Sequence, residues 1–247
     1  MRKILFSLTL PTIVIIFWAL LTTYTGIIPS YLIPSPHEVF NAFENLLFNG
    51  TLISDTIDTL SRVLLGFIIA AAIAIPLGII IGWSKTVENF FNFTIGILRP
   101  IPPIAWIPFA ILWFGLGLGS AIFVIFIGSV FPILVNTVDG VKRIDKVYVE
   151  SAYTLGANQF QTLSKVVVPA ALPNIITGLK VGMGIALMCT VAAEMIGSNN
   201  GLGYLILTAI SMLDSASAIV GMLTIGLIGL GFEYVFSRME RKINWGL

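Results

Sequence analysis

The sequence predicts an all-α membrane protein with about six transmembrane helices in one domain that covers residues 1–247. Hydrophobic residues make up 57% of the chain and charged residues only 10%, and the mean hydropathy is +1.00. Soluble domains carry about 25% charged residues. Apolar runs recur that are long enough to cross a bilayer, which takes about 20 helical residues. The net charge of +1 gives no indication of a nucleic-acid partner.

Six segments have the length and composition of membrane spans. They lie near residues 5–27, 58–82, 90–114, 119–138, 174–197 and 216–236. The first is longer than a signal-peptide core and lacks a clear cleavage site, so we expect a retained span. The third contains Arg99 and four prolines between residues 100 and 108. Because proline interrupts helical hydrogen bonds, and irregular backbone at membrane depth needs cover, this stretch is expected to face the protein interior. Five spans are the alternative.

The distribution of Lys and Arg predicts the orientation. Apart from three isolated residues, the basic residues gather at Arg2-Lys3, at Lys85, in the segment 142–165 and in the segment 238–242. With six spans, all of these clusters fall on one side of the membrane. Because cytoplasmic loops carry an excess of Lys and Arg, this side is predicted to be the cytoplasm. Both termini and the loop at 138–172 are therefore predicted to be cytoplasmic. Five spans would place one basic cluster outside.

The longest external segment is predicted at residues 29–57. It contains Ser35-Pro36-His37-Glu38, in which Ser caps a helix, Pro takes its first position and Glu completes a capping box. Apolar residues follow at helical spacing from Val39 to Leu47, which predicts an amphipathic helix on the outer membrane surface or against the helix bundle. A second external segment, 197–215, contains an apolar part too short to span, which can re-enter the bundle.

The polar stretch 138–172 predicts two short helices joined by a turn. Asp145 can cap a first helix at residues 146–155, and Gly156 suits the left-handed position after its end. Glu150 lies beside a face that a partner can approach closely, and its carboxylate can accept a bond from a basic residue of that partner. The residues on this face are Val147, Ser151, Ala152 and Leu155.

The second helix of the stretch is predicted from its own cap. The Asn158 side chain can accept a hydrogen bond from a backbone amide at the start of the helix, and Gln161 lies three residues later in the capping-box position. Pro169 and Pro173 are then expected to break the chain before the fifth span.

The spacing within this stretch carries a resemblance. Glu150-Ser151-Ala152 is followed after three residues by Gly156, and after nine more by Val166-Val167-Val168-Pro169. This resembles the cytoplasmic EAA loop of ABC-importer permeases, which reads Glu-Ala-Ala, three residues, Gly, nine residues and Ile-x-Leu-Pro. The substitutions of Ser for Ala and of Val for Ile and Leu preserve size or character. The resemblance implies docking on a separate ATPase subunit through Glu150, Ser151, Ala152, Leu155, Gly156 and Pro169.

Other stretches extend the resemblance over nearly the whole chain. Residues 98–117, 131–141, 191–206 and 33–36 are similar to the nitrate/sulfonate/taurine branch of these permeases. The resemblance implies a multi-pass permease of the type I ABC-importer kind in the plasma (inner) membrane of a prokaryote. It implies as partners a second copy of this chain, two ABC ATPase subunits and an extracytoplasmic substrate-binding protein. The implied substrate is a small anion such as an alkanesulfonate, taurine or nitrate; the alternative is a thiamine-precursor pyrimidine or another small heterocycle.

The sequence lacks the residues that catalysis or cofactor binding would need. It contains no G-x-x-x-x-G-K-[ST] phosphate loop, so ATP is expected to bind the partner ATPase and not this chain. His37 is the only histidine and Cys189 the only cysteine, so neither a metal cluster nor a Ser/His/Asp set is expected. We therefore expect no enzymatic activity, no cofactor and no metal.

Charged residues within spans are functional candidates because a bilayer makes them costly. Arg99 is the candidate for a charge on the path of an anionic substrate, with a structural pair to a carboxylate as the alternative. Glu194 is the candidate for the outer gate, with a pair in the dimer as the alternative. Arg62 and Lys180 lie near span ends, where they can snorkel. A stand-alone channel or secondary carrier is the alternative class, and it would need selectivity residues at the span centres, which are nearly free of charge.

Overall fold

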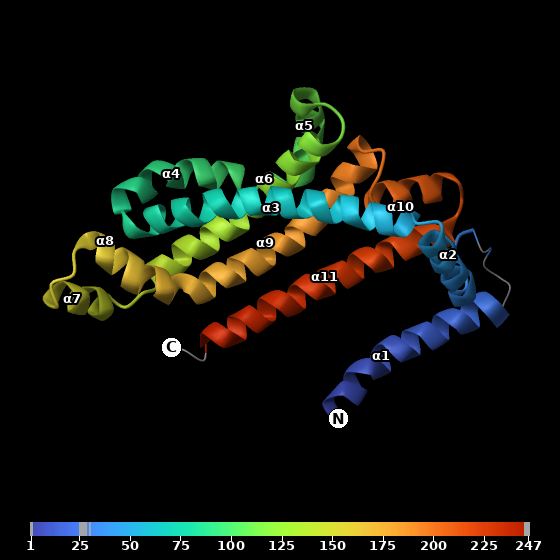
Figure 1. Cartoon of the computed structure of the whole chain (residues 1–247), viewed down its shortest axis with the longest axis horizontal. Helices are drawn as coiled ribbons and strands as arrows, with labels where there is room; N and C mark the ends of the chain where they lie inside the picture. Colours follow the sequence, from blue (N-terminus) through green and yellow to red (C-terminus); the bar gives the residue numbers. More distant parts are fainter. Residues whose placement is uncertain (1, 25–28, 30, 245–247) are drawn as a thin grey trace. The chain divides into compact units, whose positions relative to one another are not determined.

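The computed structural model describes residues 2–24, 29 and 31–244, and these residues contain helices and no strand. They form two compact units. The first unit comprises residues 1–59 and 199–226, and the second comprises residues 60–198 and 227–247. Two long helices, α3 (Thr51–Trp83) and α11 (Ser215–Asn244), contribute to both (Figure 1).

The first unit begins with α1 (Arg2–Ala19), which continues as a π-helical turn to Tyr24. The indole Nε1 of Trp18 donates to the carbonyl oxygen of Pro34 at 3.0 Å, which fixes the chain entering α2 (Pro36–Phe48). The predicted capping box is confirmed, because the Glu38 amide donates to Ser35 Oγ and the Ser35 amide donates to Glu38 Oε2. Val39 is the buried residue of this helix, whereas Phe40 is exposed.

A short helix, α10 (Leu202–Ser211), completes the first unit. It buries Leu202, Leu205 and Ile206, yet its ten residues are too few to cross a bilayer, as the sequence predicted for this segment. The Ser215 hydroxyl donates to the carbonyl oxygen of Tyr31, which joins the start of α11 to the segment before α2.

Among the described residues, four helices are long and apolar enough to cross a membrane. They are Thr51–Trp83, Leu118–Lys142, Gln159–Gly197 and Ser215–Lys242. A fifth span results if a bent pair of helices counts as one. The predicted first span, 5–27, lies partly outside the described residues, and its described apolar part, Thr12–Thr23, is shorter than a bilayer requires.

The predicted third span, 90–114, is not one straight helix. It consists of α4 (Lys85–Leu98) and the segment Pro103–Phe114, bent by 84° with respect to one another. That segment is a 3₁₀ turn, Pro103–Trp106, followed by α5 (Ile107–Phe114). The break falls on the prolines after Arg99, as proline chemistry requires, because proline cannot donate the hydrogen bonds that would continue α4.

The core of the second unit is built on α6 (Leu118–Lys142), which contacts both α3 and α9 (Val168–Gly197). Glycines mark these contacts at four-residue intervals. They are Gly78 and Gly82 of α3 and Gly178 and Gly182 of α9. A Cβ atom at any of the four would lie between 2.7 and 2.9 Å from a side-chain atom of α6. Small residues at these positions therefore permit the close approach on which helix packing in membranes depends.

We predict that Gly182→Leu destabilises the fold by about 1–3 kcal/mol, because the new side chain would overlap Ile133 in a close-packed contact. The measurement is the thermal unfolding midpoint of the purified chain in detergent. Gly184→Leu is the matched control in the same helix, since a Cβ there meets nothing within 4 Å. Both changes gain the same helix propensity. Equal midpoints for the two variants would contradict the packing role.

Candidate functional site

The polar loop of the second unit starts directly after α6. Its first helix is α7 (Lys146–Thr154), and the Val147 amide donates to Asp145 Oδ1 at 3.0 Å. The predicted cap is thus confirmed. Gly156 follows with φ of +83°, the left-handed conformation that the sequence predicted there. The turn is closed by the Ala157 amide, which donates to the carbonyl oxygen of Ala152 at 3.0 Å.

The second loop helix is α8 (Gln159–Thr162). The Gln161 amide donates to Asn158 Oδ1 at 2.8 Å, and the Asn158 amide donates to Gln161 Oε1 at 2.9 Å. The predicted capping box is therefore confirmed. The side-chain caps at Asp145 and Asn158 thus position both loop helices and the turn between them.

The predicted break at Pro169 and Pro173 is wrong. From α8 the chain passes through a π-helical turn, Leu163–Val167, directly into α9. Pro169 stands in the first turn of α9, where the missing amide hydrogen costs little, and the π-helical turn rearranges the hydrogen bonds ahead of it. Pro173 removes one further bond without ending the helix. The loop is consequently continuous with a membrane helix at its end.

Large apolar side chains are exposed on this loop. Leu155 is 88% exposed and Phe160 is 77% exposed, and Val147 and Tyr148 on α7 are also exposed. Ala152, predicted to share this face, is instead buried against its own chain. An exposed apolar patch of this kind in a polar loop is typical of a protein-interaction surface.

A cavity of about 500 Å³ lies beside the loop and is lined in part by Glu150, Lys85 and Lys146. At its edge the Lys142 ammonium pairs with Glu88 Oε1 at 2.6 Å, which ties the end of α6 to α4. Within the described part of the chain, the carboxylate of Glu150 forms no ion pair. Its charge is thus available to a partner's basic residue.

A second cavity of about 320 Å³ adjoins Arg99, at the bend after α4. The wall opposite the bend comes from α6 and α9, including Phe131, Asn136 and Val181. Arg99 is exposed and makes no ion pair with any described residue, so the structural pair considered above is not seen among them. A guanidinium in this position offers several N–H donors to an anion.

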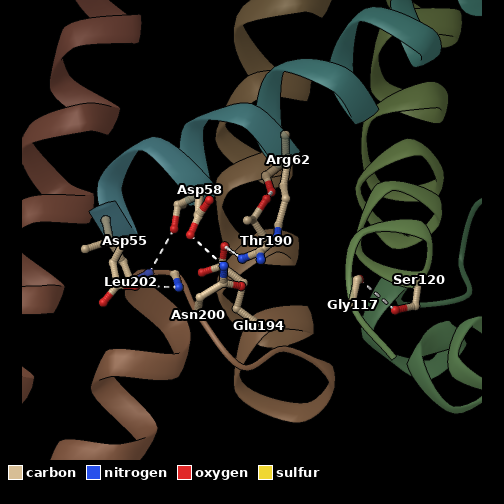
Figure 2. Close-up of polar contacts among 12 residues, drawn as sticks. Asp55, Asp58, Arg62, Gly117, Ser120, Thr190, Glu194, Asn200 and Leu202 are labelled. Atoms are coloured by element: carbon tan, nitrogen blue, oxygen red, sulfur yellow. Dashed lines mark hydrogen bonds and ion pairs between the residues drawn. The ribbon is translucent and has the colours of Figure 1, made fainter. Parts of the chain in front are cut away.

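Glu194 lies elsewhere in the second unit, in a buried ion pair. Its carboxylate is fully buried and accepts from the guanidinium of Arg62, which is 5% exposed, at 2.7 Å (Figure 2). Arg62 therefore does not snorkel. The two residues are 132 positions apart in sequence, so no spacing rule could have paired them. Lys180 is paired as well, with Glu233 at 2.6 Å.

In the first unit, α3 holds the turn that precedes α10. Asp55 Oδ1 accepts from the Gly201 amide at 2.8 Å, and Thr59 Oγ1 accepts from the Leu202 amide at 2.9 Å. Asn200 donates to Asp58 at 2.6 Å (Figure 2). These bonds satisfy amides at the start of α10, which a helix leaves without internal partners. No sequence pattern predicts this cluster, because its donors and acceptors lie more than 140 residues apart.

No group of three or more His, Cys, Asp or Glu side chains in the described ranges could hold a metal ion. Three features of the described residues are candidates for a functional role: the exposed loop, the cavity at Arg99 and the buried ion pair.

The family described as binding-protein-dependent transport system inner membrane component matches residues 74–245. The chain belongs to this family. It is the permease subunit of an ABC uptake system, a membrane-spanning protein that works with an ATPase subunit and a substrate-binding protein. The resemblance seen in the loop and the flanking stretches is thereby confirmed.

Similar proteins cover nearly the whole chain. An ABC transporter permease protein of Methanocaldococcus jannaschii is 46% identical over 246 residues, 98% of this chain and 91% of that protein. The taurine transport system permease protein TauC of Escherichia coli is 30% identical over 98% of this chain and 90% of its own length. The MetNI methionine ABC transporter, solved in inward facing conformations, has a chain with a TM-score of 0.72, covering 81% of this chain and 98% of its own at 18% identity. That likeness confirms the fold of a type I importer permease.

We predict that Glu194→Leu lowers stability by about 3–5 kcal/mol, because it leaves the Arg62 charge buried without its carboxylate. The double variant Arg62→Met with Glu194→Leu should lose clearly less, since neither charge is then stranded. Unfolding in detergent measures both. The single variant Arg62→Met completes the comparison. A loss for the double variant that equals the sum of the losses for the two single variants would show that the two side chains do not depend on one another.

Proposed function

We propose that two copies of this chain form the path of an ATP-driven importer for a small anion, such as an alkanesulfonate, taurine or nitrate. Two ATPase subunits dock on the loops around Glu150 and Gly156, and an extracytoplasmic protein delivers the substrate. The ATPases bind and hydrolyse ATP, and this chain carries the substrate without any cofactor of its own. The loops and both termini lie on the cytoplasmic side.

The observation that carries the docking role is the form of the loop. Its exposed apolar side chains, led by Leu155 and Phe160, belong to short helices fixed by their own caps, so the surface is ordered before a partner arrives. Preorganisation of this kind reduces the entropy lost on binding. Because α8 continues into α9, a displacement of the loop would be transmitted to a membrane helix through continuous helical structure.

The anionic substrate is supported by Arg99 and by the name of one relative. An exposed guanidinium beside a cavity is suited to an anion, and TauC, 30% identical to this chain, is a taurine transport permease. Taurine carries a sulfonate, which an arginine can bind through two N–H groups. We expect Glu194, held by Arg62, to support the structure near the outer end of α9 and not to move as a gate.

We predict that Glu150→Lys and Gly156→Leu each reduce uptake more than tenfold while the amount of chain in the membrane stays unchanged. The first reverses the charge offered to the ATPase. The second places a side chain at φ of +83°, which costs about 1–2 kcal/mol and distorts the turn. Both should lose the ATPase in pull-down from native membranes in mild detergent, read by mass spectrometry.

Gly96→Leu is the control for the loop variants, because a Cβ at this helical position meets nothing within 4 Å. It should keep both uptake and the ATPase. If the pull-down recovers the wild-type chain without an ATPase, and protease cuts its loop, the proposed importer assembly is wrong. A stand-alone channel or carrier is then favoured. Normal uptake in both loop variants would remove the docking role.

We predict that Arg99→Ala lowers ethanesulfonate uptake about tenfold, as expected when one opposite charge near an anion is removed. Arg99→Lys should retain most of the rate because it keeps the charge. The assay is uptake into proteoliposomes that contain the complete transporter. Equal losses for both variants would show that shape and not charge matters at this position, which would contradict the role of Arg99 in attracting the anion.

A further inference from the structure

Two cavities of the second unit lie along one face of the α6–α9 pair. The Arg99 cavity takes Gly128, Pro132 and Asn136 from α6, and a second cavity of about 690 Å³ takes Gly140 and Arg143 from the same helix. These positions recur at intervals of three or four residues, so they form a single stripe. From Pro132 to Arg143 the stripe covers about 16 Å along the helix axis.

The partner helix α9 supplies the opposite wall. It contributes Val181 and Ile185 to the Arg99 cavity, and Pro169, Ala170 and Asn174 to the second cavity. The order along α9 runs opposite to that along α6, as antiparallel helices require. We call this face, from Arg99 to Arg143 and Lys165, the α6–α9 groove.

Two asparagines occupy the middle of the groove in equivalent settings. Asn136 of α6 packs against Gly178 of α9, and Asn174 of α9 packs against Gly140 of α6. An added Cβ at those glycines would lie 2.8 and 2.7 Å from the respective asparagine Cβ atoms. Both asparagines are half-buried. Half-buried amides that line a cavity offer polar contacts to a ligand.

The amide groups retain donors for a ligand. Asn136 Nδ2 donates to the carbonyl oxygen of Pro132 at 2.8 Å, which uses one of its two N–H bonds. Within the described residues the Asn174 side chain makes no hydrogen bond. The groove thus presents neutral N–H donors, which can stabilise a passing anion without holding it as tightly as a charge would.

Cations stand at the two ends of the groove. Arg99 lies at one end, and Arg143 and Lys165 line the cavity at the other. None of these three forms an ion pair inside the described ranges. Three other basic residues of the second unit are neutralised, because carboxylates pair with Arg62, Lys142 and Lys180.

Two acidic residues belong to the same region. Asp145 lines the second cavity, but its carboxylate already caps α7 by accepting from the Val147 amide. Asp139 is exposed on α6, one turn before Arg143. This end of the groove therefore has two cations and two carboxylates, whereas Arg99 is the charged residue that lines the other end.

We propose that the α6–α9 groove, from Arg99 past Asn136 and Asn174 to Arg143 and Lys165, is the surface along which an anionic substrate crosses the permease. The assignment rests on the proposed function and adds the residues that select for negative charge. Arg99 attracts the anion, the two amides donate hydrogen bonds to it, and Arg143 and Lys165 receive it before release.

The decisive test changes charge at nearly constant size. Asn136→Asp and Asn174→Asp place a carboxylate in the groove, whereas Asn136→Leu and Asn174→Leu place an apolar group of similar volume there. We expect each Asp variant to lower uptake of ethanesulfonate, an alkanesulfonate with a net negative charge, at least about tenfold below its Leu counterpart, because like charges repel strongly away from bulk water. Complete transporters in proteoliposomes provide the rates, and the thermal midpoint and retained ATPase identify variants that fail to fold.

A second measurement does not depend on transport. In a Cys189→Ala background, Asn136→Cys should react faster with an anionic methanethiosulfonate reagent than with a cationic one of similar size. Leu230→Cys, at an exposed apolar position of α11, should react slowly with both. No preference for the anionic reagent at position 136 would overturn the proposal.

The outcomes separate the two levels of inference. Ethanesulfonate uptake by the wild type with equal rates for the Asp and Leu variants would overturn the groove and leave the importer intact. Absence of uptake for every small anion tested would overturn the anion importer and the groove together. Uptake that is at least about tenfold slower in the Asp variants than in the Leu variants, with normal folding, would support both the importer and the groove.

Discussion

Close contact between α6 and its neighbours α3 and α9 is the constraint on which the second unit depends. Lipid chains are as apolar as leucine, so helices in a bilayer gain little from hiding apolar surface against one another. They associate where small residues let their backbones approach. Gly78 and Gly182 serve this purpose, because a Cβ at either would lie within 3 Å of an α6 side chain. This contact sets the spacing of the helices that carry the loop and the groove.

Electrostatics then divides the charged residues into two groups. Arg62 and Glu194 neutralise one another where no water reaches, so they form part of the fold. Arg99 has no such partner among the described residues and stands beside a cavity. A charge left unpaired near membrane depth is costly unless a ligand or water compensates it. The contrast between the two arginines therefore favours a substrate path beside Arg99.

Mechanical continuity links the loop with this path. The caps at Asp145 and Asn158 order the loop helices, and the π-helical turn joins α8 to α9 without the break predicted at the prolines. A rigid connection would let a displacement of the loop move α9 as a unit. Because α9 forms one wall of the groove, movement of the ATPases and access to the substrate path would be coupled through a single helix.

The sequence by itself determined the membrane class, the loop with its caps and left-handed Gly156, the capped helix after Ser35 and the family. These features depend on composition or on hydrogen bonds between residues within a few positions, so local chemistry is sufficient. Only the tertiary structure decided that Arg62 meets Glu194, that the chain bends by 84° after Leu98, and that Asn136 and Asn174 share a groove. Such pairings join residues far apart in the chain, and they follow from which helix faces come into contact, which periodicity alone does not specify. The continuous passage through Pro169 belongs to the same group, because neighbouring turns compensated for a residue that ordinarily ends a helix.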